Sequence, residues 1–408
     1  MKSILIFAYY GFKDPVFQSA VLPYFLNFPN KDQYRFILLT FEHEKFMLTP
    51  LEKEEITREL ASNNIEWIQN KWRSGKFKPI KKLYDLTTGV FKTMALVKKY
   101  QVTCIYCEGF PGAVIAHYVA RLTRRPHIVH TFEPHTDYMI EGGTWKKTSW
   151  EAILLRRFET WVAKKAAVLM TGTQAMIDIW RKKTKAQFYR VPSCVDVKHF
   201  RFDQDERDAI RKKYDIRENE VVFVYLGKFG GMYVEGELFD FFREVKLSQA
   251  NSSSSFRFMI LTPDKKERIE ALVSESGMQL ERFIIESLTR DQVPSYLSAA
   301  DIAFSGVRQY PSKRYCSPIK HGEYWACGLP VIVPDGISDD YLLVTKYEIG
   351  WCLPAFTKEA YAATVKKIFI EWCWQKQAEY RQRTRQFVIR DRNVEEYQPL
   401  YAKIFSEF

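Results

Sequence analysis

Residues 312–332 carry the clearest chemical signal in the sequence. Their pattern predicts a loop, a helix that begins near Pro318, a glycine that ends this helix, and then a buried strand. The N–H groups of Ile319 and Lys320 would then point at a bound phosphate, because the N-terminus of a helix attracts anions. Glu323 lies about one turn further along, where its carboxylate could accept hydrogen bonds from a ribose diol. A plain helix-surface carboxylate is the alternative for Glu323 alone.

A second candidate is the glycine-rich turn at residues 227–231, which follows the apolar run at residues 221–226. Gly230 and Gly231 permit close backbone approach and unusual φ angles, and Lys228 adds a cation. Such a turn can hold a diphosphate with its N–H groups and its lysine. The spacing matches neither the P-loop nor the dinucleotide fingerprint, so an ordinary turn is the alternative.

A third candidate is the loop that follows an expected strand at residues 127–132. His130, near the end of that strand, lies close in the sequence to three residues of the loop, Glu133, His135 and Asp137. A histidine, with a pKa of about 6.5, can donate or accept hydrogen bonds at working pH. A structural role is the alternative for either histidine alone, and the neighbouring carboxylates favour a functional one.

These loops need a scaffold that holds them at one edge of a sheet, where open α/β proteins bind their ligands. Apolar runs alternate with helical stretches along the chain, which predicts doubly wound α/β sheets. The pattern restarts after a polar connector, and 408 residues exceed what one core usually serves, so we expect two domains. We place them at residues 1–192 and 193–384, with a C-terminal helix at 385–408 packing back on the first. The expected strands lie at residues 4–10, 34–40, 65–68, 104–107, 127–132, 167–171, 188–192, 221–227, 256–262, 282–285, 300–305 and 329–334, and a long helix is expected at 359–388.

The segment from Glu323 to Ile332 resembles the donor-binding signature of the retaining family 4 glycosyltransferases of the GT-B fold. Their usual pattern is two Glu with seven residues between them, followed by A-x-G-x-P-V-I. Glu323 matches the second Glu and residues 326–332 match the tail, whereas Tyr315 stands in place of the first Glu. Related members with a Ser-Pro-x-Lys-x-x-Glu form also lack it. Lys228 stands where the family has an arginine at a strand end.

This resemblance implies two Rossmann-like domains that face a central cleft, with the acceptor bound by residues 1–192 and the donor by residues 193–384. It implies retention at the anomeric carbon and an active-site histidine, for which we take His135 first and His130 second, with Glu133 beside them. Gly11, Gln18 and Ser19 correspond to the family's N-terminal loop on the acceptor side. The implied donor-binding residues are Lys228, Gly230, Gly231, Arg314, Ser317, Pro318, Ile319, Lys320 and Glu323.

The positive charge of the chain lies in its N-terminal half. Residues 1–200 hold 31 Lys and Arg against 18 Asp and Glu, whereas residues 201–408 hold 30 against 31. Such a field attracts polyanions or an anionic membrane surface. The densest stretch runs from Lys71 to Lys82 and interleaves basic residues with aromatic ones, which suits a bilayer interface. A solvated loop is an equal alternative, and nucleic acid is disfavoured because no nucleic-acid-binding module accompanies the stretch.

We expect a cytoplasmic protein, either free or peripheral on the inner face of the membrane. No apolar run reaches the roughly 18 residues of a membrane-spanning helix, and the apolar start is too short for a signal peptide. Seven scattered cysteines fit a reducing compartment. Cys104 and Cys107 form a lone C-x-x-C inside an expected buried strand, which argues against a zinc or redox site.

The hypothesis from sequence is a glycosyltransferase that moves a sugar from a nucleoside-diphosphate sugar to a hydroxyl of a glycan or glycolipid. No cofactor or metal is expected, because no cluster of ligating side chains has metal-site spacing. One alternative is a sugar-nucleotide epimerase or hydrolase of the same fold. Another is a non-catalytic protein of the membrane surface that retains a nucleotide pocket.

Overall fold

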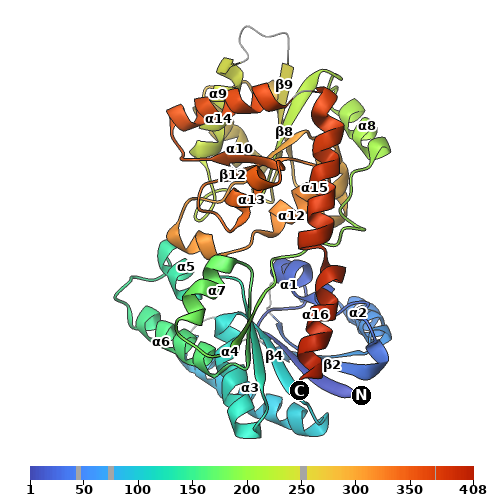
Figure 1. The fold of residues 1–408 in the computed structure, drawn as a ribbon, viewed down its shortest axis with the longest axis vertical. Helices are drawn as coiled ribbons and strands as arrows, with labels where there is room; N and C mark the ends of the chain where they lie inside the picture. The colour runs from blue at the N-terminus through green and yellow to red at the C-terminus, as the bar shows by residue number, and fades with distance from the viewer. Residues whose placement is uncertain (43–46, 72–77, 249–254, 373) are drawn as a thin grey trace. The chain divides into compact units, whose positions relative to one another are not determined.

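The computed structural model describes residues 1–42, 47–71, 78–248, 255–372 and 374–408, and the chain divides into two compact units (Figure 1). In each unit, helices flank a parallel sheet. Unit 1 consists of Met1–Ile140, Thr144–Cys194 and Val394–Phe408, and unit 2 consists of Glu141–Gly143 and Val195–Asn393. The α/β class and the Rossmann-like character expected from the alternating pattern are confirmed for both units.

Unit 1 contains a seven-stranded parallel sheet in the order β3-β2-β1-β4-β5-β6-β7. Its central strands are buried on both faces, which explains why they read as unbroken apolar runs. The strands are β1 (Lys2–Ala8), β2 (Tyr34–Glu42), β3 (Ile65–Lys71), β4 (Cys104–Glu108), β5 (His127–Thr131), β6 (Val168–Thr171) and β7 (Gln187–Arg190). The helices are α1 (Pro15–Ala20), η1 (Leu22–Tyr24), η2 (Lys31–Gln33), α2 (Pro50–Ser62), α3 (Lys78–Lys99), α4 (Gly109–Thr123), α5 (His135–Glu141), α6 (Trp150–Lys165), α7 (Gln174–Arg181) and α16 (Val394–Ser406).

Unit 2 contains a six-stranded parallel sheet in the order β10-β9-β8-β11-β12-β13. The strands are β8 (Glu220–Leu226), β9 (Ser255–Leu261), β10 (Phe283–Glu286), β11 (Ile302–Phe304), β12 (Val331–Pro334) and β13 (Gly350–Leu353). The helices are α8 (Gln204–Lys213), α9 (Gly236–Ser248), α10 (Lys266–Glu275), η4 (Leu280–Arg282), η5 (Arg290–Gln292), α11 (Val293–Ala299), η6 (Pro311–Tyr315), α12 (Ile319–Ala326), α13 (Asp340–Lys346), α14 (Lys358–Glu371), η7 (Trp374–Lys376) and α15 (Gln377–Arg392).

Two expectations about the C-terminal part of the chain were wrong. The single helix expected at residues 359–388 is two helices, α14 and α15, because the chain turns extended at Trp372. The strand series also continues to β13, a four-residue edge strand that is too short to give a periodic pattern. The chain turns extended again at Asn393, so that α15 belongs to unit 2 whereas α16 packs its Tyr401 and Phe405 into the core of unit 1.

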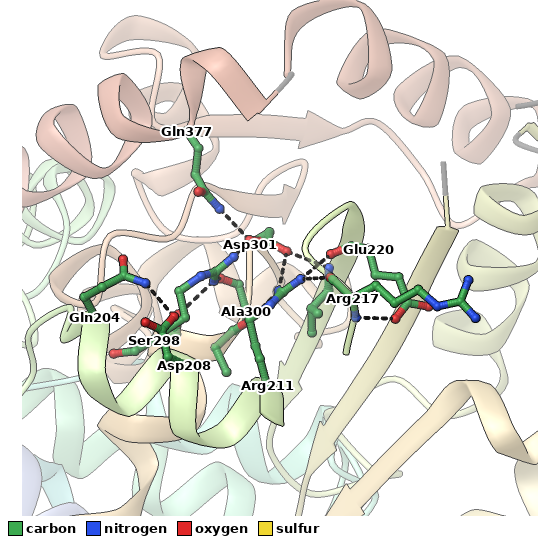
Figure 2. Close-up of polar contacts among 12 residues, drawn as sticks. Gln204, Asp208, Arg211, Arg217, Glu220, Ser298, Ala300, Asp301 and Gln377 are labelled. Atoms are coloured by element: carbon green, nitrogen blue, oxygen red, sulfur yellow. Dashed lines mark hydrogen bonds and ion pairs between the residues drawn. The ribbon is translucent and has the colours of Figure 1, made fainter. Parts of the chain in front are cut away.

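Asp301 lies at the centre of a buried polar network at the start of β11 (Figure 2). One carboxylate oxygen, Oδ1, accepts hydrogen bonds from Arg207 Nη2 at 2.8 Å and from the Gln377 side chain. The other oxygen, Oδ2, accepts the N–H of Val222 at 2.8 Å and lies 3.5 Å from Arg211 Nη1. Both arginines come from α8, so this one carboxylate fastens α8 and α15 to the central strands of unit 2.

Two further observations bear on the membrane expectations. The basic stretch from Lys71 to Lys82 falls largely outside the described residues. The structure describes Lys71 at the end of β3 and, for residues 78–82 of this stretch, the backbone alone. Within the described part of the chain, no helix is both long and apolar enough to cross a bilayer.

Candidate functional site

The glycine-rich turn of unit 2 follows β8 directly, at the carboxyl edge of the sheet. Gly230 has a φ of 83° and Gly231 a φ of 61°, so the unusual backbone expected at both glycines is confirmed. The N–H of Phe229 donates to Asp264 Oδ2 at 2.7 Å. Asp264 lies just after β9, the strand next to β8, so this hydrogen bond anchors the turn to the neighbouring loop. Lys228 is exposed on this turn.

Helix α12 begins at the same edge, because it follows the loop after β11 and must run back across the sheet to β12. Its N-cap residue is Pro318, which makes no side-chain capping hydrogen bond. The first N–H groups of a helix have no partner within it, so an anion placed here would meet unpaired donors. The N–H of Leu226 donates to Tyr324 Oη at 2.7 Å, which ties α12 to the end of β8.

Lys320 joins the turn to the helix. A Cβ atom built on Gly227 would lie only 3.0 Å from Lys320 Nζ, so the glycine makes room for this ammonium group. The ammonium group also lies 4.8 Å from the centre of the Tyr233 ring, at cation–π distance. Burial lowers the pKa of Lys320, the nearby Lys228 lowers it further, and Glu323 opposes both. Two cations and the start of α12 therefore come together.

Glu323 is buried on α12 with 6% of its surface exposed. Its Oε1 lies 3.2 Å from Nη1 of Arg290, a residue that sequence reasoning missed. Burial raises the pKa of Glu323, and the charges of Arg290 and Lys320 oppose the rise. A carboxylate has about four acceptor positions, so the contact with Arg290 leaves capacity for a diol. The position of Arg290 just after β10 is the one signal that could have pointed to it.

A buried network supports the loop that precedes α12. Arg392 Nη1 donates to Ser317 Oγ at 2.6 Å, and the same guanidinium group pairs with Asp340. His321 bridges Asp340 and Ser305, with 2.7 Å from its ring nitrogens to each. Ser317 is thus held in place by the end of α15. Sequence reasoning singled out Ser317 but neither Arg392 nor Asp340.

The remaining donor-side residue, Arg314, is exposed in η6, on the loop that leads to α12. The structure describes no close contact between Arg314 and Lys228, Lys320 or Glu323 in the parts of the chain that it covers.

Within those same parts, His, Cys, Asp and Glu side chains form no group of three or more that could hold a metal ion.

In unit 1, His135 and Glu133 lie beyond the end of β5. His135 is the first residue of α5 and is partly exposed, with its ring 6.2 Å from that of Tyr138. Glu133 is close enough to Tyr10 for its charge to contribute to the raised pKa of that tyrosine, which results mainly from burial. Because β1, β4 and β5 are neighbours, these residues share the carboxyl edge of the sheet.

His130 lies inside β5 with 1% of its surface exposed. Its Nδ1 is 2.9 Å from Tyr106 Oη and 3.4 Å from Glu108 Oε1, and its Nε2 is 3.3 Å from the carbonyl oxygen of Val191. Both ring nitrogens face protein groups. This placement favours the structural role of His130 over a catalytic one.

The acceptor-side residues lie in and after the loop that follows β1. Gly11 accepts the N–H of Asp14 at 3.0 Å in this turn. The Gln18 side chain donates to the carbonyl oxygen of Phe12 at 2.7 Å, and Ser19 is buried in α1. The Gln18 side chain, on α1, therefore stabilises the loop with a hydrogen bond to its backbone.

Comparison with known proteins gives a family match and several similar folds. Residues 206–387 match the family model described as "Glycosyl transferases group 1". The fold is similar to HepE of Anabaena, with a TM-score of 0.73 and 14% identity over 100% of both chains. It is also similar to sucrose-phosphate synthase of Thermosynechococcus elongatus (0.69, 14%, 100% of both) and to a glycosyltransferase of Rickettsia africae (0.67, 14%, 100% of this chain and 98% of that one). Comparison with curated protein sequences gives no match.

Two parallel-sheet units with Rossmann-like topology and this helix-and-turn site define the GT-B class. The chain is a glycosyltransferase of the GT-B fold, and its second unit carries the group 1 glycosyltransferase sequence. The expectation of a glycosyltransferase of the GT-B fold is thereby confirmed.

Proposed function

We propose that this enzyme transfers a sugar from a nucleoside-diphosphate sugar to a hydroxyl group of a glycan or glycolipid, with the donor bound by unit 2 and the acceptor by unit 1. The observation that carries the proposal is the meeting of Lys228, Lys320, Glu323 and the uncapped start of α12 at one edge of the sheet of unit 2.

Each part of this site has a task in the proposal. The N–H groups of Ile319 and Lys320 and the ammonium groups of Lys228 and Lys320 bind the diphosphate. The same groups stabilise the charge that develops on the diphosphate as it leaves, and they do so from fixed positions. Glu323, held by Arg290, accepts hydrogen bonds from the ribose hydroxyls. The backbone of Gly230 and Gly231 allows close approach of the ligand.

Known relatives support a nucleoside-diphosphate donor. The HepE structures contain UDP, UDP with glucose, or UDP-glucose. A UDP-hexose is therefore the first donor to test here.

Retention at the anomeric carbon rests on the resemblance of residues 323–332 to the retaining family, and NMR of the first-formed product anomer tests it.

Release of UDP and GDP from a panel of sugar nucleotides, with and without glycan or lipid-linked acceptors, tests the function. We expect release that depends on acceptor and that persists in EDTA, because the proposed site uses lysines and N–H groups in place of a metal. Release without acceptor would indicate a hydrolase, and an isomerised sugar nucleotide would indicate an epimerase. Binding of the nucleotide with no reaction under any condition would leave the non-catalytic alternative.

Replacing Glu323 with glutamine should weaken nucleotide binding. A charged acceptor contributes more to a hydrogen bond than a neutral one, so the Kd for UDP should rise roughly 10- to 100-fold. Isothermal titration calorimetry measures the change. Glu359→Gln, an exposed carboxylate in the first turn of α14, is the matched control and should leave the Kd unchanged. An unchanged Kd in Glu323→Gln would remove Glu323 from the ribose site.

Replacing His135 with alanine should lower kcat far more than donor affinity, because we propose that this side chain faces the reacting sugar. Loss of a hydrogen-bonding group at a reaction centre typically costs roughly 100-fold or more in rate. His130→Ala is the informative comparison. It should reduce the melting temperature, since it empties a buried position, while the folded fraction keeps its activity. The reverse pattern would exchange the roles of the two histidines.

A further inference from the structure

Helix α6 presents an unusual face to the solvent. Residues spaced three and four apart share one face of a helix, and here that spacing brings Trp150, Ile153, Leu154, Phe158 and Trp161 together. Trp150 is 66% exposed, Ile153 47% and Leu154 43%. Solvent-facing helix positions are normally polar, so this stripe has no explanation within unit 1.

Helix α4 widens the apolar stripe. Tyr118 and Leu122, one turn apart, are exposed, Leu122 by 60%. The ring of Tyr118 lies 5.5 Å from that of Trp161, so the two helices form one surface. A shallow depression between them is lined by Tyr118, Leu154, Arg157, Phe158 and Trp161. Both helices belong to unit 1 (Figure 1).

The apolar stripe is surrounded by positive charge. Arg157, Lys164 and Lys165 share the outward face of α6 by the same spacing and are exposed. Further exposed cations stand at the end of α4 and just before α6, namely Arg121, Arg124, Arg125, Lys146 and Lys147. Of the two acidic residues of α6, Glu159 is buried, which raises its pKa to about 7, and Glu151 is half-buried in the first turn.

We propose that this surface of α4 and α6, here called the α4–α6 face, docks on an anionic lipid bilayer. A helix that combines exposed Trp, Ile and Leu with Lys and Arg suits the interfacial region, where the apolar side chains enter the acyl boundary and the cations meet lipid phosphates. The charge complementarity favours a bilayer over a second copy of the chain, because two copies would oppose like charges across the contact. None of the residues of this face belongs to the basic stretch at residues 71–82.

Vesicle sedimentation tests the proposal on the full chain. Phosphatidylcholine vesicles with about 30% phosphatidylglycerol should bind the protein, and pure phosphatidylcholine should bind it much less. The triple variant Trp150→Ser, Ile153→Ser, Leu154→Ser should reduce partitioning to anionic vesicles roughly tenfold or more. The variant Arg157→Gln, Lys164→Gln, Lys165→Gln should cause a loss of similar size that appears only with anionic lipid.

Matched controls separate docking from loss of fold or of function. The variant Leu51→Ser, Leu247→Ser, Ile370→Ser removes three similarly exposed apolar side chains elsewhere and should bind vesicles as the parent does. UDP affinity should be unchanged in all variants, because none touches the donor site. Equal vesicle binding by the parent and the α6 variants would overturn the proposal. A second result would also overturn it. If light scattering showed that the parent is a dimer and that the variant Trp150→Ser, Ile153→Ser, Leu154→Ser is a monomer, the α4–α6 face would be an interface between two copies of the chain.

Discussion

Replacing Lys320 with methionine should lower kcat/KM for sugar transfer roughly 100- to 1,000-fold. Lys320 is half-buried, with its ammonium group beside Gly227 and close to Lys228, so the charge acts where water screens it poorly. Methionine is unbranched and one atom shorter than lysine, and it removes the charge together with the N–H donors of the ammonium group. The effect should appear mainly in kcat, because the charge on the diphosphate grows as the bond to the sugar breaks.

Initial-rate measurements over donor concentration check this prediction, with the melting temperature as a test of folding. Lys358→Met, at an exposed position of α14, is the control and should keep its activity. A Lys320→Met enzyme with nearly unchanged kcat/KM would mean that Lys320 is a structural residue, and the diphosphate site would have to be placed elsewhere.

The second large effect concerns stability. Replacing Asp301 with asparagine should destabilise unit 2 by about 3–5 kcal/mol, because it leaves the buried guanidinium groups of Arg207 and Arg211 without their counter-charge. The corresponding fall in melting temperature is roughly 10 °C for a domain of this size. Calorimetry on the full chain measures it.

An exposed ion pair in the same unit provides the contrast. Asp240 and Arg243 lie 2.9 Å apart on α9 and are both about half exposed. Asp240→Asn should change stability by less than about 1 kcal/mol, because water screens the pair. Equal destabilisation by the two substitutions would show that the network of Figure 2 contributes no more than a surface contact.

The elements that position the site could largely be predicted from the sequence. The apolar run expected at residues 221–227 is β8, which spans Glu220–Leu226, and the helix expected to begin near Pro318 is α12, which begins at Ile319. These signals are strong because a strand buried on both faces needs an unbroken apolar run, and because proline and glycine mark where helices start and stop. The positive φ angles of Gly230 and Gly231 follow from the same local logic.

The partners of the charged residues could not be predicted in this way. Arg290 meets Glu323, and Arg392 meets Ser317 and Asp340, although each pair is far apart in the sequence. The difference between His130 and His135 has the same origin. His130 lies within the run expected at residues 127–132 and His135 lies just after it, yet His130 is buried in unit 1 and His135 is partly exposed.

The sequence by itself determined the class of the elements, the glycine turn, the proline that opens α12 and the excess of positive charge in the first half of the chain. Only the tertiary structure decided which cations approach Glu323, which histidine is buried and which face of α6 stays in solvent. The reason is physical: periodicity, caps and turns depend on neighbours along the chain. Charge pairing and burial depend instead on distances that the order of the strands and the packing of the helices create.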